Sequence, residues 1–489
     1  MSSDWDELLA ELDARTRRAE TMGGAQRLER QRSRGRLDAR TRVARLCDAG
    51  SFREIGALVG SAASGGAPVV PADALVGGTA HIDGRPVVVL AEDFTVQGGS
   101  IGHGTHAKRV RLALLAERER IPLLSLLDGA GERTSNALER YPYAPNDLQV
   151  IADLVGVVPM VTLVLGSSAG HGALSGVFAD LIVMTQGASM FTAGPPLVEA
   201  ALGLRVDPET LGGASMHTSE SGVAHNLAAT EDDAFELARR FLSYLPTRRG
   251  EAVPPPDSPD RAPRRLDDLL AVIPRNVRQA YDMREVITRL VDHGTVLELQ
   301  PHYGDTMITA LARLGGTSVL VLANQPMVMG GAITKEAALK ATHFLQVADA
   351  FGLPLVFLAD NPGVMAGPDA ERAGTLRAAA QMYAAQRGAR SQKLHVTVRK
   401  AFGFGSSLMA MNPFDHQTVT LALPGISLGG VPAFGGAQAA GSSQRDAEAL
   451  RATQESAWRP ADNGGYDRVI DPRELRNELL AGLRLATVP

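Results

Sequence analysis

The sequence predicts an α/β protein made of two copies of one domain, each with a parallel β-sheet core and flanking helices. Three observations predict this fold. The segment 84–131 repeats at 316–363 without a gap. In each copy, apolar runs of strand length alternate with helical patterns. The apolar runs end in glycine-rich turns, which are typical of the edge of a parallel sheet where ligands bind.

The repeat is the strongest of these observations, because it pairs residue types that seldom coincide by chance. One offset of 232 residues aligns the two segments, and an offset of 233 then aligns 170–172 with 403–405. The sequence therefore indicates a duplication within one chain. The pairs at the first offset are Ala91 and Ala323, Gly98-Gly99 and Gly330-Gly331, Lys108 and Lys340, Ala116 and Ala348, Pro122 and Pro354, Asp128 and Asp360, and Gly131 and Gly363.

The elements of the first copy follow from their apolar spacing. The predicted elements are a strand at 87–90, a glycine-rich loop at 98–104, a helix at 106–118, and strands at 121–127 and 158–165. The helix should bury a face formed by Val110, Ala113 and Leu114. Because strands alternate with a helix, the strands should run parallel.

A proline-rich segment divides the chain. Residues 246–265 read PTRRGEAVPPPDSPDRAPRR, and three successive prolines cannot continue a helix or an inner strand. We expect an extended linker there, between an N-terminal domain at 1–245 and a C-terminal domain at 266–489. Residues 1–45 are rich in Arg, Glu and Asp at helical spacing and predict surface helices.

Composition excludes several classes of function. The 489 residues carry a formal net charge of −5, so neither nucleic acid nor an anionic membrane is expected as a partner. Cys47 is the only cysteine, which excludes an internal disulfide and a Cys-based zinc ribbon. The uncharged stretch 154–179 contains Pro159 and several glycines, so it predicts a buried strand and turn rather than a membrane span. The acidic N-terminus is unlike a signal peptide, and the expected location is the cytoplasm.

Two glycine-rich turns, 167–173 and 400–406, are the main candidate for chemistry. In each, a strand ends and a helix begins, and the first N–H groups of a helix have no acceptor within it. Two such N–H groups can stabilise an oxyanion such as a thioester enolate. The alternative is that the glycines only let helix and strand pack closely. The occurrence of the turn in both copies favours the functional interpretation.

The loop at 91–104 is not a nucleotide-binding motif. No Gly-Lys-Ser/Thr follows it and no GxGxxG opens the next helix, so a phosphotransferase is poorly supported. Lys108 in that helix has two interpretations. It either binds a cofactor phosphate, or shares a structural role with its repeat partner Lys340.

The remaining polar candidates are weaker. His103 and His106 lie three residues apart, but no carboxylate or cysteine joins them at ligand spacing, so no metal site is predicted. Asp128 and Asp360 end apolar strands and are either bases or turn residues that cap glycine loops. Ser167 and Ser168 lie near the first glycine-rich turn, but no His and Asp partners follow in the order of a serine hydrolase, which disfavours that class.

Several motifs together resemble one family, the carboxyltransferase (β) subunit of biotin-dependent acyl-CoA carboxylases of the propionyl-, acetyl- and methylcrotonyl-CoA type, in the crotonase superfamily. The resemblance spans nearly the whole chain. It includes GRLDARTRVARLCDAGSFREIG (35–56), EDFTVQGGSIG (92–102), MFTAGPPLVEAALG (190–203), LGGASMHTSESGVAHNLAATEDDAF (211–235), ADNPGVMAG (359–367), VRKAFGFGSS (398–407) and GYDRVIDPRELR (465–476).

The resemblance implies two tandem crotonase-like domains and an enzyme that moves CO2 from carboxybiotin to an acyl-CoA. The N-terminal domain would hold the acyl-CoA and the C-terminal domain the carboxybiotin, with a biotin nitrogen as the base and no metal in this chain. Carried over by motif, the oxyanion-stabilising amides are those of Gly170, His171, Phe404 and Gly405. The residues expected around the cofactor and the thioester are Gly98, Gly99, Lys108, Ala169, Gly363 and Gly403.

The same resemblance implies partners. The chain has no Ala-Met-Lys-Met biotinylation site, since Met409-Ala-Met-Asn412 lacks the lysine. We therefore expect biotin on a separate chain, a biotin carboxylase and biotin carrier (α) subunit. The family also assembles as a homohexamer, a trimer of dimers.

The sequence departs from the family pattern inside both turns. Most relatives have glycine where this chain has His171, and a small residue where it has Phe404. Two alternatives therefore stay open: a decarboxylase subunit that runs the reaction backwards, and a scaffold homologue whose amide sites are altered. The AGPPLV and VRKAFG motifs are typical of different branches, so the acyl-CoA substrate is not predicted.

Overall fold

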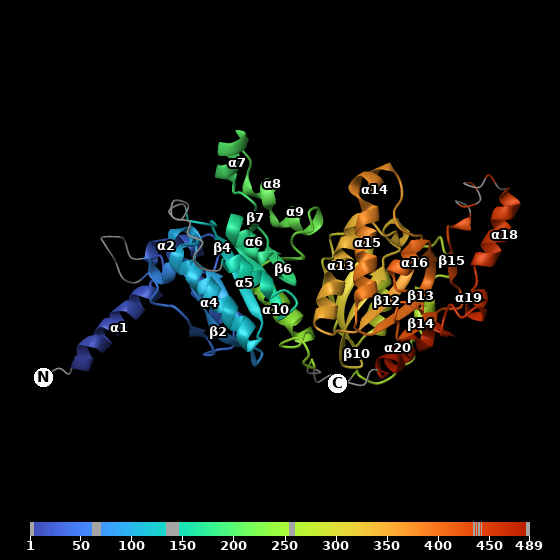
Figure 1. The fold of residues 1–489 in the computed structure, drawn as a ribbon, viewed down its shortest axis with the longest axis horizontal. Helices are drawn as coiled ribbons and strands as arrows, with labels where there is room; N and C mark the ends of the chain where they lie inside the picture. Colours follow the sequence, from blue (N-terminus) through green and yellow to red (C-terminus); the bar gives the residue numbers. More distant parts are fainter. Residues whose placement is uncertain are drawn as a thin grey trace. The chain divides into compact units, whose positions relative to one another are not determined.

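The structure is a computed structural model that describes residues 4–60, 70–133, 146–253, 260–433 and 443–485, together with residues 436, 438 and 441. The chain divides into two compact units, Met1–Glu251 and Ala252–Pro489, which we call unit 1 and unit 2 (Figure 1).

Unit 1 contains an eight-stranded sheet in the order β1-β2-β3-β4-β5-β6-β8, with β7 paired to β5. The β1–β3 pairs are antiparallel and the later pairs are parallel. Its strands are β1 (Arg53–Glu54), β2 (Leu75–Ile82), β3 (Arg85–Glu92), β4 (Leu123–Gly129), β5 (Met160–Ala169), β6 (Leu181–Thr185), β7 (Ser189–Phe191) and β8 (Asn226–Ala228). Its helices are α1 (Asp4–Glu20), α2 (Ala25–Arg32), α3 (Ala39–Leu46), α4 (His103–Glu119), α5 (Asp147–Asp153), α6 (Gly170–Gly176), α7 (Pro195–Leu202), α8 (Pro208–Gly212), α9 (Ala214–Ser219) and α10 (Glu231–Tyr244), with 3-10 turns η1 (Pro71–Ala74) and η2 (Gln97–Gly99).

Unit 2 contains a second eight-stranded sheet in the order β16-β14-β13-β12-β11-β10-β9, with β15 paired to β13. Its strands are β9 (Leu297–Leu299), β10 (Met307–Leu314), β11 (Thr317–Asn324), β12 (Leu355–Asn361), β13 (Lys393–Phe402), β14 (Val419–Ala422), β15 (Ser427–Gly429) and β16 (Arg468–Val469). Its helices are α11 (Leu269–Val272), α12 (Met283–Leu290), α13 (Lys335–Ala350), α14 (Pro368–Ala373), α15 (Thr375–Gly388), α16 (Phe404–Leu408), α18 (Gln444–Gln454), α19 (Trp458–Asp462) and α20 (Leu475–Leu483), with 3-10 turns η4 (Met329–Gly331) and η5 (Pro472–Glu474).

The two sheets confirm the duplicated α/β fold. Strands β3 and β4 match β11 and β12 at the predicted offset of 232 residues, and β5 matches β13 at 233. Even an isolated bridge is repeated, since Ile101 pairs with Glu132 in unit 1 and Ile333 pairs with Val364 in unit 2. The central parallel strands are buried on both faces, which explains their continuous apolar sequence.

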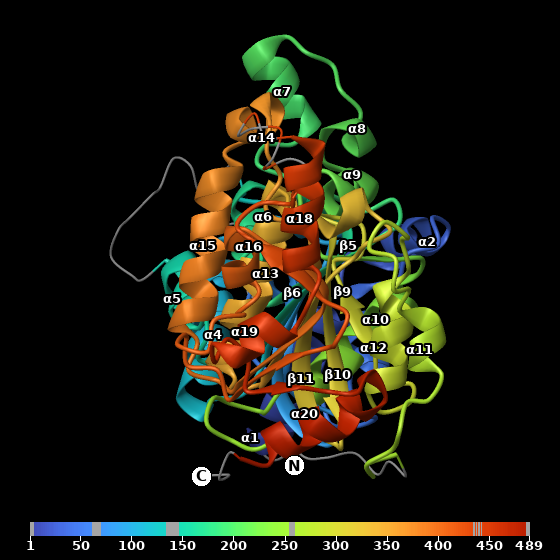
Figure 2. The same cartoon turned by 90° about the vertical axis from the view of Figure 1, so that its right-hand side faces the viewer.

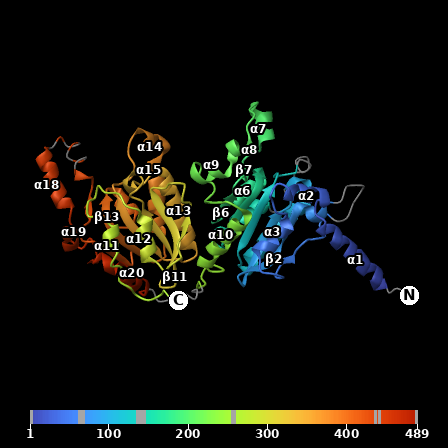
Figure 3. The same cartoon turned by 180° about the vertical axis from the view of Figure 1, so that it is seen from behind.

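Helices cover both faces of each sheet. In unit 1, α4, α5 and α6 lie in front of the sheet in Figure 1, and α3 and α10 lie on the side seen in Figure 3. In unit 2, α13 and α15 lie on one side of β10 and β11, and α12 lies on the other (Figure 2). A large buried aliphatic cluster of unit 2 includes Val286, Ile287 and Leu290 of α12.

Helix α4 differs from the prediction in two respects. It begins at His103 rather than His106, because Gly102 precedes it and the Gly102 amide donates to the Thr105 hydroxyl. Its buried face is also rotated from the predicted one. Leu112, with Ala113 and Ala116, is buried, whereas Leu114 is 43% exposed. The expectation that Leu114 faces the core is wrong, because the buried Lys108 and Arg109 occupy part of that face.

The proline-rich segment lies at the division between the units. Within the predicted linker 246–265, residues 254–259 lie outside the described residues. The residues that follow pack on unit 2: the Arg264 guanidinium donates to the carbonyls of Arg289 and Val291, and the Asp260 carbonyl accepts from Arg476. Among the described residues, no helix has both the length and the apolar character needed to cross a membrane.

Candidate active site

Two equivalent turns stand where β5 and β13 end. Gly170 and Gly403 have φ angles of +55° and +56°, in the left-handed region that glycine tolerates best. Helix α6 begins at Gly170 and α16 begins at Phe404, so the amides of His171 and Gly405 both lie in a first turn, where no intrahelical acceptor exists. Both units therefore have a positive-φ glycine at the end of the strand and the first turn of a helix directly after it, although α6 begins at that glycine and α16 begins one residue later.

The glycine-rich loop comes to the same edge of unit 1. Gly98 and Gly99 have φ angles of +65° and +66°, and a Cβ added to Gly99 would lie 2.4 Å from the Asp128 carbonyl oxygen. A Cβ on Gly131 would likewise lie 2.5 Å from the Ala169 carbonyl oxygen. These close approaches join the loop, the end of β4 and the end of β5. The structure thus brings Gly98, Gly99, Ala169 and Gly170 to one edge of the sheet.

Unit 2 repeats these close glycine contacts, but an exposed phenylalanine follows its turn. A Cβ on Gly331 would lie 2.4 Å from the Asp360 carbonyl oxygen, and one on Gly405 would lie 2.9 Å from Gly363 Cα. The Gly403 amide donates to the Gly429 carbonyl, which fixes the turn. The Phe404 side chain is 53% exposed, so it leaves the backbone turn rather than packing over the core.

The His171 side chain of unit 1 turns towards a buried charge cluster. Its Nε2 lies 2.5 Å from Asp147 Oδ1, and the other Asp147 oxygen accepts from Arg109 Nε at 2.6 Å. His106 Nδ1 lies 3.4 Å from the same Oδ1. Burial acts to raise the pKa of Asp147, but hydrogen bonds from His106 and His171 and the charge of Arg109 outweigh it and hold the pKa below its ordinary value. Asp147 is therefore an ionised hydrogen-bond acceptor.

The His106, Asp147 and His171 side chains are close enough together to be compared with a metal site. Zinc bonds to nitrogen and oxygen are about 2.0–2.2 Å long, so two ligands of one ion lie roughly 3 Å apart or more. The 2.5 Å between His171 and Asp147 is instead a hydrogen-bond distance, and Arg109 already occupies the second carboxylate oxygen. The group is a hydrogen-bonded cluster. The sequence reasoning missed it because Asp147 is distant in sequence from both histidines.

Glu92 lies beneath the α6 turn and was not singled out from the sequence. Its carboxylate accepts from the Asp128 amide at 2.9 Å and lies 3.3 Å from Arg109 Nη1. A Cβ added to Gly172 would lie 3.2 Å from Glu92 Oε1. Burial raises the pKa of Glu92 to about 7. The signal available in the sequence was a glutamate at the end of an apolar strand, where the repeat has Asn324.

Lys108 does not reach the turn. Its Nζ donates to the carbonyls of Ala72 and Leu75 and is buried, and burial lowers its pKa to about 8. Lys340 of unit 2 donates in the same way to the Gln300 carbonyl, and burial lowers its pKa to about 7. This shared position favours the structural role over phosphate binding.

Asp128 and Asp360 are both fully buried and both paired with arginine. Asp128 accepts from Arg42 Nη1 at 2.9 Å, and Asp360 accepts from Arg399 Nε at 2.8 Å. Each carboxylate is thus engaged by a buried guanidinium in a charge-assisted hydrogen bond. The arrangement favours a structural role, although the partner is a distant arginine rather than the adjoining glycine loop.

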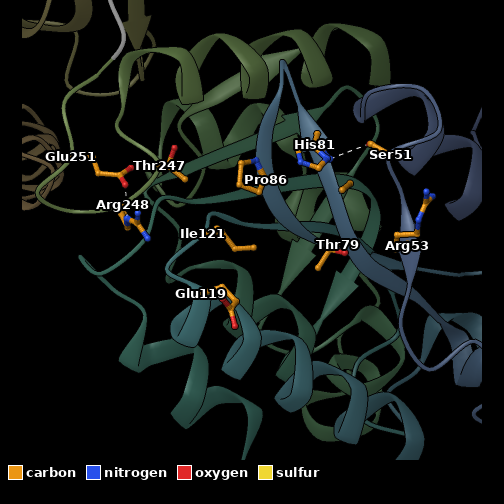
Figure 4. A pocket seen from close by; sticks show the side chains of 11 residues that line it. Ser51, Arg53, Thr79, His81, Pro86, Glu119, Ile121, Thr247, Arg248 and Glu251 are labelled. Atoms are coloured by element: carbon orange, nitrogen blue, oxygen red, sulfur yellow. Dashed lines mark hydrogen bonds and ion pairs between the residues drawn. The ribbon is translucent and has the colours of Figure 1, made fainter.

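An open hollow of about 720 Å³ lies elsewhere in unit 1 (Figure 4). It is lined by Pro86 at the start of β3 and Ile121 just before β4, with Arg53, Glu119 and Arg248 around them. These residues mark the amino ends of the parallel strands. Since ligands of such sheets bind at the carboxyl ends, the hollow is not the candidate active site.

Comparisons with known proteins cover almost the whole chain. The carboxyl transferase domain family matches residues 30–486. The methylmalonyl-CoA decarboxylase subunit alpha of Veillonella parvula is 34% identical over 472 residues, which cover 95% of this chain and 92% of that protein. The methylmalonyl-CoA carboxyltransferase 12S subunit of Propionibacterium freudenreichii subsp. shermanii is 34% identical over 488 residues, which cover 95% of this chain and 91% of that protein.

A solved structure gives the same result. The transcarboxylase 12S crystal structure, a hexamer with methylmalonyl-coenzyme A and methylmalonic acid bound, superposes with a TM-score of 0.93 at 32% identity. The match covers 99% of this chain and 96% of that one. The likeness therefore extends over both units.

Proposed function

This chain belongs to the carboxyl transferase domain family, and we propose that it moves CO2 from carboxybiotin on a partner protein to an acyl-CoA through an enolate held by backbone amides. The resemblance to this family and its enzyme class is confirmed, and the two units are its tandem crotonase-like domains. The observation that carries the mechanism is the matched positive-φ glycine, Gly170 in unit 1 and Gly403 in unit 2, at the start of a helix that follows a central strand. The proposed donors begin at this glycine in unit 1 and one residue after it in unit 2.

In unit 1, the amides of Gly170 and His171 would hold the thioester oxygen. Negative charge grows on that oxygen as the enolate forms, and neutral N–H donors fixed in place stabilise it without rearranging. Losing one such donor costs about 3–4 kcal/mol in well-studied enzymes. The close contacts of Gly99 with β4 and of Gly131 with β5 fix the backbone that carries these donors.

In unit 2, the amides of Phe404 and Gly405 would hold the biotin ureido oxygen. Backbone N–H donors suit this oxygen, because it is a neutral acceptor that gains negative charge when the neighbouring ring nitrogen loses its carboxyl group. When bound, carboxybiotin supplies the CO2 and the nitrogen that takes the α-proton. The protein then has to position the reactants and stabilise the enolate, and it needs no side-chain base. This agrees with the pairing of Asp128 and Asp360 with arginine.

The proposal includes an assembly. The solved 12S relative is a hexamer, and the chain matches it over both units, so we propose a homohexamer. The biotin would be carried by a separate biotin carboxylase and biotin carrier subunit, since the sequence has no biotinylation motif. Within the proposed site, Gly98, Gly99, Ala169, Gly363 and Gly403 shape the turns.

A second candidate function is decarboxylation of a carboxyacyl-CoA, with CO2 passed to biotin. The observation in its favour is that the decarboxylase subunit of Veillonella parvula is as similar to this chain as the 12S carboxyltransferase, at 34% identity each. The same amides would serve both directions, because both pass through the same enolate. The partner subunit and its energy source would then decide the direction.

The test is carboxyl transfer with defined variants. The chain is supplied with its biotinylated partner, ATP and labelled bicarbonate, and acid-stable label is measured with acetyl-, propionyl-, butyryl- and methylcrotonyl-CoA. Label loss from carboxyacyl-CoA onto biotin measures the reverse direction. Absence of transfer in both directions, with the folded chain bound to its partner, would contradict the proposal.

The matched variants are Gly170→Ala and Gly203→Ala. Both positions have positive φ, +55° and +67°, and neither added Cβ meets an atom closer than 3.4 Å. Both therefore carry a similar backbone strain of about 1 kcal/mol. Only Gly170→Ala would tilt the His171 amide, so we expect it to lower the transfer rate at least tenfold while Gly203→Ala changes it less than twofold.

A further inference from the structure

The His171 imidazole is a group that the proposed amide mechanism does not use. Asp147 is an ionised acceptor, so the His171 nitrogen 2.5 Å from it, Nε2, must carry a hydrogen. That hydrogen bond fixes the tautomer and the ring orientation, as a carboxylate does for a catalytic histidine. The nitrogen that remains to gain or lose a proton is therefore Nδ1.

Covalent geometry places Nδ1 close to the proposed thioester site. Four bonds separate it from the amide nitrogen of its own residue, which limits the distance to about 4–5 Å in any rotamer. An acyl oxygen held by the His171 amide would therefore bind in the neighbourhood of this ring, and the C–H group two bonds from that oxygen is the one that we infer Nδ1 meets. This step rests on the proposed function, because it requires the thioester oxygen to bind that amide.

Nδ1 also has a path to solvent. It lies 3.6 Å from Glu132 Oε2, on the segment that follows β4, and the Glu132 side chain is 47% exposed. Asp147, in contrast, is fully buried and receives the opposite edge of the ring. The imidazole thus has one edge fixed to the protein interior and the other beside an exposed carboxylate that can exchange protons with water.

The duplicated scaffold shows that the fold does not need this cluster. At the repeat offsets, unit 2 keeps the buried lysine and the buried aspartate but replaces the charged or polar residues around the α6 turn. Unit 2 forms the equivalent sheet and a matching turn without these residues, so the sheet and the turn do not by themselves require the cluster. The replacements are Asn324 for Glu92, Ala338 for His106, Ala341 for Arg109 and Phe404 for His171.

We propose that His171 Nδ1 transfers protons to and from the α-carbon of an acyl-CoA bound to unit 1, independently of biotin, with Asp147 as its positioning residue. In the forward step the Nδ1 lone pair takes the α-proton, and the C–H electron pair becomes the enolate held by the amides. The proton passes to water through Glu132. In the reverse step a solvent proton returns through Nδ1 to the α-carbon, so the net chemistry is α-proton exchange with no oxidant or co-reactant.

The experiment uses the full chain without any biotinylated protein. Propionyl-CoA is incubated in D2O, and deuterium at the α-carbon is followed by mass spectrometry. We expect exchange above the protein-free rate, at least thirtyfold slower in His171→Gly and His171→Gln. The glutamine keeps a donor towards Asp147 but cannot take up a proton. Added imidazole should partly restore His171→Gly. The control His302→Asn removes an exposed histidine of unit 2 and should leave the rate unchanged.

The pH dependence of exchange tests whether Asp147 positions His171, because a purely structural role of Asp147 would leave that pH dependence unchanged. Asp147→Asn should shift the pH at which exchange is half-maximal, because the charge that faces the imidazole changes. Among the described residues, the charged and titratable groups of the elements packed around the α6 turn include Asp147 of α5, Glu132 after β4, His106 and Arg109 of α4, and Glu92 of β3.

The outcomes separate this inference from the proposed function. Carboxyl transfer with the partner, but no exchange above background by the chain alone, overturns the inference and leaves the proposed function standing. Exchange that persists in both His171 variants, whose melting curves show that they fold, also overturns it. Loss of both transfer and exchange in the wild-type chain overturns both.

Discussion

Glu92→Gln tests whether a buried carboxyl titrates beneath the candidate active site. Burial raises the pKa of Glu92 from 4.5 to about 7, so the folded chain holds this proton more tightly than the unfolded chain. The stability that the group contributes is full below pH 4.5 and is lost as the pH rises through 7. A change of this size corresponds to about 3 kcal/mol, or about 6 °C in melting temperature for a unit of this size.

The glutamine variant should remove this dependence without removing the hydrogen bond. Asn324, at the matched position of unit 2, accepts from the Asp360 amide at 3.1 Å, as Glu92 accepts from the Asp128 amide. An amide side chain therefore suits the site and stays neutral at every pH. We expect the variant to gain about 6 °C relative to wild type as the pH rises from 4.5 to 8.

The assay is thermal unfolding of wild type and variant at fixed protein concentration over that pH range. Other groups titrate in the same window, among them Asp180, whose pKa burial raises to about 7, but they cancel in the difference between the two proteins. Glu117→Gln, on the exposed side of α4, is the control and should give a flat difference. A flat difference for Glu92→Gln as well would refute the account of its burial.

Three further changes separate structural from functional roles. Arg42→Ala leaves two carboxylates without their buried guanidinium, so we expect a loss of about 3–5 kcal/mol in a denaturant titration, and a loss below 1 kcal/mol would contradict the buried pairing. Gly99→Ala should lower the melting temperature far more than Gly84→Ala. Both have positive φ, which costs about 1 kcal/mol, but only the first Cβ meets backbone at 2.4 Å, and equal effects would show that this contact relaxes. Lys108→Met should lower the melting temperature, because two carbonyls lose their donor, while the dissociation constant for coenzyme A measured by calorimetry stays within twofold. A much weaker coenzyme A affinity would instead support phosphate binding.

Sequence reasoning reached the fold because the information was periodic and duplicated. The offset that paired Gly99 with Gly331 is visible in the letters alone, and the structure gives both residues the same close approach to the next strand. The turn at Gly170 was predictable for the same reason. The error at Leu114 shows the limit of such patterns, because a buried arginine and lysine can take part of a helix face that apolar spacing assigns to the core.

The charge cluster around Asp147 could not be read from the chain. Its members come from α4, α5 and α6, and no spacing rule connects a residue at the start of α5 with one at the start of α6. Only the packing of three helices on one face of the sheet brings them together. The departure at His171 was visible as an unusual residue in a glycine-rich turn, but the partner that gives it a chemical role was not.

Duplication also distinguishes residues that support the scaffold from those that serve one unit. Lys108 and Lys340 bond backbone carbonyls in both units, and Asp128 and Asp360 pair with arginine in both, so selection for one fold explains them. Glu92, the residue beneath the turn, has no ionisable counterpart in unit 2. An ionisable cluster beneath one of two otherwise equal turns makes their electrostatics unequal. Two turns that bound the same ligand would have no reason to differ in this way, so the inequality supports one turn for a thioester enolate and the other for a neutral ureido oxygen.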